Sequence, residues 1–506
     1  MPNKKVSRKA PPKGKAKVKG FSITDHYILL LSVFLIAMFL IFFLNSKNIS
    51  TLTVQLSFVA GLIPLTVYAA YLSSKGRFKS DSLPGFIIVV GVFLRVVYTI
   101  YTPFTIRQHD VIGSSFNHLD YIKQIANNFS LPQVDYCQAY HPPVHHAMSA
   151  VFYSIGKAFG LSEFNSFRLV QLFMVFLSSL TLILVYKILK EIRCNNNVIL
   201  AGISIFAFHP YNIYFSSFLN NDNTLFFFYT LSFYYLIKWI YNKSLKNIIL
   251  LSLFVSLAIL TKKPAIIILP IIFTAFMVVL YKNRSSYKPY LKQFLVFLGI
   301  AAPLSASYSI RNYILFKQGL FYTPGVSFEK YSNSFKNLFY TPIKGWFTNP
   351  FTPDPYTGNS ALFSDYVLKS SLFGEWRFPG LEKAATILIL ASVACILIIA
   401  IYLIIENKNI IKGYGYLFLL NLILPYALLF QSRISNPVVC AQNFRYAAPL
   451  LISVAYFYGK AADKFSSSTN FKFLKYVLIV CTIAFCLFST VFILQIGAAP
   501  GDAYNF

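Results

Sequence analysis

Histidine and aspartate gather in one stretch of the chain, and these are residue types that proton-transfer chemistry uses. Residues 105–111 read T-I-R-Q-H-D-V, which places His109 beside Asp110. Five of the seven histidines fall between residues 109 and 146. An aspartate in such a cluster can act as general base on an acceptor hydroxyl, while a neighbouring histidine or arginine orients it or holds a phosphate. The spacing equally supports a second interpretation, in which Asp110 pairs with Arg107 on an exposed loop.

The rest of this stretch supplies candidates for substrate binding. His118, Tyr121 and His141 lie within it, and we predict that they contact the substrate. His145 and His146 follow, and the favoured interpretation puts them on the water-facing side of a surface helix. Because His and Asp are both metal ligands, a divalent cation such as Mg²⁺ or Mn²⁺ is an open alternative, and no residue is assigned as its ligand.

Two further clusters carry charges that a phosphate-binding site or a second catalytic acid would need. Asp222 lies in N-N-D-N at 220–223, where turn formation is a strong alternative explanation. Lys262 and Lys263 lie in T-K-K-P, where phosphate binding and snorkelling at a helix end are equally supported. The planar guanidinium of arginine suits phosphate oxygens. Arg311 and Arg445 complete the predicted phosphate-binding set, and Glu375, in S-L-F-G-E-W, is predicted to contact the substrate.

The composition indicates that membrane-spanning helices must position these residues. The 506-residue chain is 56% hydrophobic and 12% charged, whereas soluble proteins carry roughly a quarter charged residues. Its mean hydropathy is +0.59. We therefore predict an all-α polytopic membrane protein with about thirteen transmembrane helices, each roughly 20 residues long. The predicted spans are 27–45, 51–72, 85–103, 168–188, 198–217, 223–241, 247–261, 265–281, 293–310, 384–405, 414–431, 446–462 and 476–497.

The charge distribution predicts which side of the membrane each loop faces. The first twenty residues carry eight Lys or Arg and no acid, so we place the N-terminus on the cytoplasmic side of a bacterial plasma (inner) membrane. The long loops 104–167 and 311–383 then lie on the extracytoplasmic side with most of the acids. Counting 142–160 as a span would invert the later loops, so we predict a surface helix there. The candidate site is therefore extracytoplasmic.

The predicted domain organisation has four parts. They are a basic cytoplasmic tail (1–26), an additional N-terminal helical hairpin (27–84), a transmembrane module that carries the candidate site (85–462), and a C-terminal span with a short outer tail (463–506). The tail suits anionic lipid headgroups. A nucleic-acid partner is not expected, because no aromatic residue is interleaved with the charges of the tail.

Two of the six cysteines, Cys137 and Cys440, lie in predicted outer loops. A disulfide between them is an open alternative in an oxidising compartment. Two unpaired cysteines are the favoured interpretation, because connectivity does not follow from sequence.

The order of the motifs resembles the GT-C glycosyltransferase superfamily. Over residues 85–460 the similarity is to the bacterial branch that includes protein O-mannosyltransferase-like enzymes and the lipid A aminoarabinose transferase. The motifs in chain order are R-Q-H-D-V, H-L-D-Y-I, L-P, Y-H-P-P-V, N-N-D, L-T-K-K-P, R-N, S-L-F-G-E and N-F-R-Y-A-A-P.

This resemblance implies a fold with a large first outer loop carrying surface helices, and a sugar donor linked to a polyprenyl phosphate. It also implies Asp110 as catalytic base, Asp222 as the second acid, and Lys262 or Lys263 at the donor phosphate, with Arg311 and Arg445 as helpers. Two features depart from the family pattern. His-Asp replaces the usual Asp-Glu pair at the base, and two spans precede the usual first one.

We therefore predict a membrane glycosyltransferase that moves a sugar from a polyprenyl-phosphate donor to an acceptor hydroxyl on a lipid, polysaccharide or protein. Direct displacement with Asp110 as base would invert the anomeric carbon, and His109 would assist. A polytopic lipid or glycan transporter is the alternative. It predicts polar residues in mid-span, whereas here Arg95 is nearly the only mid-span charge.

Overall fold

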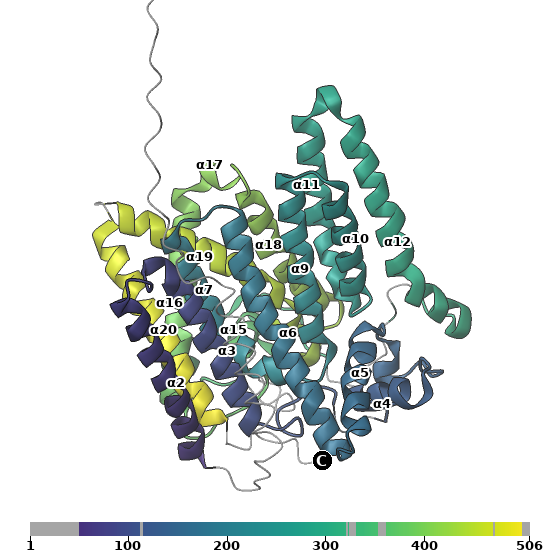
Figure 1. Cartoon of the computed structure of the whole chain (residues 1–506), viewed down its shortest axis with the longest axis horizontal. Coiled ribbons are helices and arrows are strands. Elements are labelled where there is room, and N and C mark those ends of the chain that lie inside the picture. Colours follow the sequence, from purple (N-terminus) through teal and green to yellow (C-terminus); the bar gives the residue numbers. More distant parts are fainter. Residues whose placement is uncertain are drawn as a thin grey trace, which may run out of the picture.

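The computed structural model describes residues 50–111, 115–319, 322, 330–352, 361–468 and 471–497. Every regular element in this part of the chain is a helix, as predicted. Figure 1 shows long helices side by side in one bundle. The predicted tail and the predicted span 27–45 lie outside the described residues.

Each predicted span within the described residues contains a helix. The long helices are α2 (Thr51–Ser74), α3 (Leu83–Tyr101), α6 (Glu163–Glu191), α7 (Asn196–Phe208), α9 (Asn221–Tyr241), α10 (Leu245–Ile259), α11 (Ile268–Lys282), α12 (Lys288–Phe316), α16 (Glu382–Ile405), α18 (Gly415–Ser435), α19 (Leu451–Ser467) and α20 (Lys472–Ile496).

Shorter helices fill the connections. The α-helices among them are α4 (His118–Asn128), α5 (Val144–Ala158), α8 (Pro210–Tyr214), α13 (Phe335–Phe339), α14 (Gly345–Thr348), α15 (Phe363–Phe373) and α17 (Asn407–Ile410). The 3₁₀ turns are η1 (Ser80–Ser82), η2 (Cys137–Tyr140), η3 (Phe215–Ser217), η4 (Lys263–Ile267), η5 (Arg284–Ser286), η7 (Val439–Gln442), η8 (Phe444–Tyr446) and η9 (Ala448–Leu450).

The prediction of thirteen spans is not confirmed. Among the described residues, eight helices are long and apolar enough to cross a membrane, or nine if α7 and the following α8–η3 segment, bent by 61°, form one span. A span needs about 20 apolar residues, whereas α10 has 15 and α19 has 17. Helix α9 is long enough but opens with polar residues and is largely buried by protein. A helix that neighbouring helices cover does not need a fully apolar surface.

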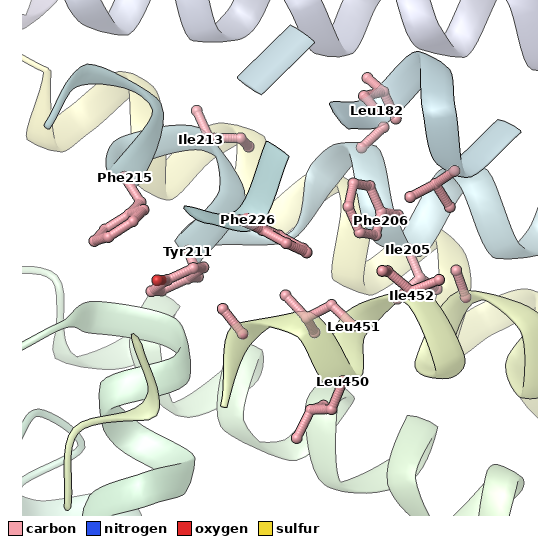
Figure 2. Close-up of a cluster of buried hydrophobic side chains, with 14 of the residues drawn as sticks. Leu182, Ile205, Phe206, Tyr211, Ile213, Phe215, Phe226, Leu450, Leu451 and Ile452 are labelled. Atoms are coloured by element: carbon pink, nitrogen blue, oxygen red, sulfur yellow. The ribbon is translucent and has the colours of Figure 1, made fainter. Parts of the chain in front are cut away.

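The centre of the bundle is held by close contact between α7 and α19. A Cβ added at Gly202 would lie 2.3 Å from the carbonyl oxygen of Ala455, and one at Gly459 would lie 2.2 Å from that of Val198. Such small residues let two helix backbones approach in a membrane protein. Figure 2 shows large apolar side chains of the buried core, from α6, α7, α8, η3, α9, η9 and the start of α19.

The surface helix predicted over 142–160 is present as α5 and packs against α4 and α6. The prediction that His145 and His146 face water is wrong, because both side chains are fully buried. They lie in the first turn of α5, which α4 covers, so the exposed face of α5 is formed by other residues. Periodicity could not reveal this cover, because α4 comes from a different part of the same loop.

Figure 1 shows α4 and α5 at the lower end of the bundle, and α17 and the α11–α12 turn at the upper end. The candidate site lies where three segments meet. These are the chain after α3, the N-terminus of α9, and the turns before α19. The bundle therefore brings together segments that are more than three hundred residues apart in sequence.

Candidate active site

The segment that carries Asp110 is anchored to the turn before α9. Gln108 accepts a hydrogen bond from the backbone N–H of Leu219 at 2.9 Å and donates to the carbonyl of Ser217 at 3.4 Å. Arg107 and Asp110 both have left-handed backbone conformations, with φ of 52° and 58°. This conformation is uncommon for residues other than glycine, and it makes the chain turn sharply on either side of His109.

The ionic partner of Asp110 is Arg445. Its Nη1 lies 3.5 Å from Asp110 Oδ2, and 46% of the Asp110 side chain is exposed. The alternative interpretation, an exposed pair with Arg107, is wrong in its geometry. Arg107 is buried and donates to the Ile496 carbonyl at 2.7 Å and to the Tyr98 hydroxyl at 3.2 Å. Asp110 is therefore an accessible carboxylate that contacts the buried guanidinium of Arg445.

Asp222 lies in the first turn of α9 and is buried. The N-cap residue Asn220 accepts a hydrogen bond from the Asp222 backbone at 3.2 Å, which starts the helix there. Lys262 donates to Asp222 Oδ1, and Arg445 Nη1 lies 3.8 Å from Asp222 Oδ2. The predicted second acid, a predicted phosphate-binding lysine and a predicted helper arginine are thus brought together, with Arg445 between the two aspartates.

Electrostatics keep this buried pair charged. Burial opposes ionisation of Asp222, but Lys262 and Arg445 outweigh burial and lower the pKa of this carboxyl. Burial also lowers the pKa of Lys262, although Asp222 opposes that shift. The ammonium and guanidinium of Lys262 and Arg445 lie over the ring of Tyr446, at 4.9 Å and 5.0 Å from its centroid. The charges at this site therefore compensate one another.

His109, the residue directly before Asp110, belongs to a second pair. Its Nδ1 lies 3.2 Å from Glu375 Oε2, and Asn443 donates to Glu375 Oε1 at 2.6 Å. The imidazole packs against Trp376, with 4.9 Å between ring centroids. Burial opposes ionisation of Glu375, but His109, Arg445 and Asn443 outweigh it and lower its pKa to about 2. Glu375 is thus a fixed carboxylate that orients His109.

The predicted substrate-binding residues His118, Tyr121 and His141 are buried. Their rings form a near-parallel column with His146, with centroids 3.8 Å apart for Tyr121 and His146 and 5.1 Å apart for His118 and His146. Burial, reinforced by the charge of Lys262, lowers the pKa of His118 and His141 well below 6.5. These imidazoles are therefore neutral near pH 7, and their contact with substrate stays a prediction.

Two predicted phosphate-binding residues lie outside the ion-pair cluster of Asp110, Asp222, Lys262 and Arg445. Arg311 donates to the Pro132 carbonyl at 2.6 Å and ties α12 to the first long loop. Lys263 donates to the Tyr322 carbonyl at 3.2 Å and lines a cavity of about 200 Å³ between η4 and α12. Apolar side chains form most of the cavity wall, among them Ile259, Leu269, Phe297 and Leu298.

The donor set at the ion-pair cluster does not suit Mg²⁺ or Mn²⁺, which prefer several oxygen ligands. Asp222 is bound by Lys262, and Glu375 by His109 and Asn443. Within the described residues, the single group of three candidate metal ligands consists of histidines, at the surface helices. Cys137 is a free cysteine.

Sequence reasoning missed several residues that hold this site. Asn443 and Tyr446 flank Arg445 in the motif N-F-R-Y, and Trp376 follows Glu375 directly. These residues could have been found from the sequence, because each lies within two positions of a predicted site residue. Gln108 had no comparable signal, because its partners come from a turn more than a hundred residues away.

Residues 140–306 match the family model described as dolichyl-phosphate-mannose-protein mannosyltransferase. No curated protein matches the chain. Similar solved structures include the apo oligosaccharyltransferase of Archaeoglobus fulgidus, at 13% identity and a TM-score of 0.48, covering 83% of this chain and 56% of that one. ArnT from Cupriavidus metallidurans bound to undecaprenyl phosphate shares 12% identity, with a TM-score of 0.47, covering 82% of this chain and 77% of that one.

The chain spans about half the length of the archaeal enzyme, whose structure tethered with an acceptor peptide gives 13% identity, a TM-score of 0.46 and coverage of 83% and 55%. The matched family segment includes α5, the first turn of α9 with Asp222, and the T-K-K-P segment with Lys262. The predicted resemblance to GT-C enzymes is thereby confirmed within residues 140–306, which make up less than half of the chain.

Proposed function

We propose that this chain is a membrane glycosyltransferase that transfers a sugar from a polyprenyl-phosphate-linked donor to an acceptor hydroxyl on the extracytoplasmic face of a bacterial plasma membrane. The observation that carries the proposal is the contrast among the acids of the site. Asp110 is 46% exposed, whereas the side chains of Asp222 and Glu375 are 1% and 13% exposed and are bound to cationic or amide groups. Asp110 is the carboxylate that a substrate hydroxyl can reach.

In the proposed reaction Asp110 takes the proton of the acceptor hydroxyl. The acceptor oxygen bonds to the anomeric carbon while the bond from that carbon to the phosphate oxygen breaks, and the electron pair leaves with the lipid phosphate. A single displacement of this kind inverts the anomeric carbon. His109, held by Glu375, borders Asp110 and orients the acceptor. A positioned general base such as Asp110 contributes typically 10²–10⁴-fold to the rate.

Positive charge is needed where the phosphate leaves. Arg445 lies between the two aspartates, and Lys262 lies behind Asp222, so both can stabilise the growing negative charge. The apolar cavity beside Lys263 suits a hydrocarbon chain, and the Lys263 ammonium at its wall suits a lipid phosphate. The family description names a dolichyl-phosphate sugar, which is the proposed class of donor.

The test is transfer of label from a radiolabelled polyprenyl-phosphate sugar by the purified chain in detergent, with membrane extract as the source of acceptor. Asp110→Asn keeps the size of the side chain but removes the base, so we expect turnover to fall by about 10²–10⁴-fold. Thermal unfolding should change little, because Asp110 is half-exposed.

Glu163→Gln is the matched control, because Glu163 is an exposed acid outside the site and its side chain is 57% accessible. We expect this variant to transfer label at the wild-type rate. Equal transfer by wild type and Asp110→Asn would contradict the assignment of the base. No transfer by the wild type from any labelled lipid donor would favour the transporter alternative.

A further inference from the structure

Three buried histidines meet where the two surface helices and α9 come together. His118 is the first residue of α4, and His145 and His146 lie in the first turn of α5. Each can offer one ring nitrogen such that the three nitrogens lie within 4.8 Å of one another. All three side chains are at most 1% exposed. The capping box of Asn117 and Asp120 fixes the start of α4 and hence the place of His118.

We propose that His118, His145 and His146 form a binding site for a divalent transition metal of the zinc class, which ties α4 to α5. This site shares no residue with the ion-pair cluster of Asp110, Asp222, Lys262 and Arg445, although the His118 backbone N–H donates to the Asp110 carbonyl at 3.2 Å. The proposal does not depend on the proposed function, because a metal at this position would act on the structure of the first long loop.

The hydrogen bonds of His145 prepare one of its nitrogens as a ligand. Its Nε2 lies 3.0 Å from the carbonyl oxygen of Leu219, which can only accept, so Nε2 carries the proton. The lone pair is then on Nδ1, where it accepts a hydrogen bond from the Thr224 hydroxyl at 2.9 Å, and a metal ion would take the place of this hydrogen bond. Metal-bound histidines usually donate their other N–H to a backbone carbonyl or carboxylate in this way.

The other two histidines share one proton at the same point. His118 Nδ1 and His146 Nε2 are 2.9 Å apart, so one of these nitrogens must be protonated to form the hydrogen bond. A metal ion would take the place of that proton, which moves to the other nitrogen of the same ring, and would accept both lone pairs. Tetrahedral bonds of roughly 2.0–2.1 Å place ligand nitrogens about 3.3 Å apart. Nitrogens that already lie within 4.8 Å of one another can reach this spacing by small ring movements.

The ligand type selects the class of metal. Imidazole suits Zn²⁺, Co²⁺, Ni²⁺ and Cu²⁺, whereas Mg²⁺ and Mn²⁺ prefer oxygen ligands. Three histidines leave a fourth position for water or another small ligand. A metal here would hold α4 and α5 against Leu219 and Thr224, near the start of α9.

The test begins with the tag-free, full-length chain in detergent, treated with chelator and then dialysed against Zn²⁺, Co²⁺ or Mg²⁺. We expect Zn²⁺ to bind in equimolar amount by elemental analysis, with X-ray absorption showing nitrogen neighbours at about 2.0–2.1 Å. Co²⁺ should give the visible absorption of a four-coordinate site. Zn²⁺ should raise the midpoint of thermal unfolding, and Mg²⁺ should not. A wild-type chain that binds no Zn²⁺ or Co²⁺ overturns the proposal.

Two variants assign the site to these residues. His146→Gln and His118→Asn should each lose the equimolar metal and the cobalt spectrum. His209→Gln is the matched control, because His209 is also buried but lies between α7 and α8, outside the triad. This control should keep both signals. Retention of equimolar metal by His146→Gln and His118→Asn overturns the proposal, as does loss of the cobalt spectrum in His209→Gln alone.

Discussion

Asp110 and Asp222 share one arginine but have opposite environments. Asp110 is on a loop, half-exposed, and meets Arg445 at 3.5 Å. Asp222 is on a helix N-terminus, buried, and bonds to Lys262 while Arg445 lies 3.8 Å away. The buried acid therefore has its charge compensated within the protein, while the exposed acid shares only an edge of the same guanidinium.

The comparison separates two roles that the residue type alone does not distinguish. A buried ion pair costs desolvation free energy and holds its members in one geometry. Asp222 thus positions Lys262 and Arg445, and these in turn set the charge beside Asp110. An accessible carboxylate pays little desolvation and can exchange a proton with a bound substrate. We therefore propose proton transfer for Asp110 and positioning for Asp222.

Asp222→Asn tests the positioning role and should have the largest effect on stability. It leaves the Lys262 ammonium buried without its carboxylate, and breaking a buried pair in this way costs about 3–5 kcal/mol. Chemical or thermal unfolding in detergent measures this loss against Asp110→Asn, which should cost less than about 1 kcal/mol. Similar losses in the two variants would break the comparison between the acids.

A double substitution, Asp222→Asn with Lys262→Met, sharpens the same comparison. It removes both buried charges, so the free energy of unfolding should recover most of the loss seen with Asp222→Asn. Transfer activity should stay low, because the cation near the leaving phosphate is also gone. Recovered activity in the double variant would contradict the proposed role of Lys262.

Glu375→Gln tests whether Glu375, the partner of His109, contributes to stability like the buried Asp222 or like the exposed Asp110. The folded pKa of Glu375, about 2, lies below its ordinary value of 4.5. Its contribution to stability is therefore fully present above about pH 4.5 and is lost as pH falls toward 2. Near pH 7 the free energy of unfolding of the wild type should exceed that of the variant by roughly 3 kcal/mol, at 1.36 kcal/mol per pKa unit. The difference between the unfolding midpoints of the two proteins should narrow as pH is lowered from 7 to 3.

Lys123→Met should have the smallest effect on the free energy of unfolding, because it removes an ion pair that is exposed to solvent. Lys123 lies 3.3 Å from both Asp120 and Glu163, and all three side chains are at least 34% exposed. Exposed pairs of this kind contribute about 0–1 kcal/mol, and salt screens them. The difference in unfolding free energy from wild type should shrink further in high salt. A loss as large as that of Asp222→Asn would mean that exposure does not separate the two kinds of acid.

Much of the site could be predicted because its residues are chemically distinctive. Asp110, Asp222, Lys262 and Arg445 were chosen from charge, motif and loop position, and the structure brings these four together. Arg311 was chosen for the same reasons but bonds to the Pro132 carbonyl. The sequence contains the charge of a residue but not the identity of its partner.

Composition and periodicity determined the helical class, the membrane location and the surface helix, because these depend on local patterns of apolar residues. Only the tertiary structure decided which histidines are buried, which arginine meets Asp110, and that His109 bonds to Glu375. Each of these contacts joins segments far apart in the chain. Burial and ion pairing are properties of the packed bundle, so no local pattern in a single sequence can specify them.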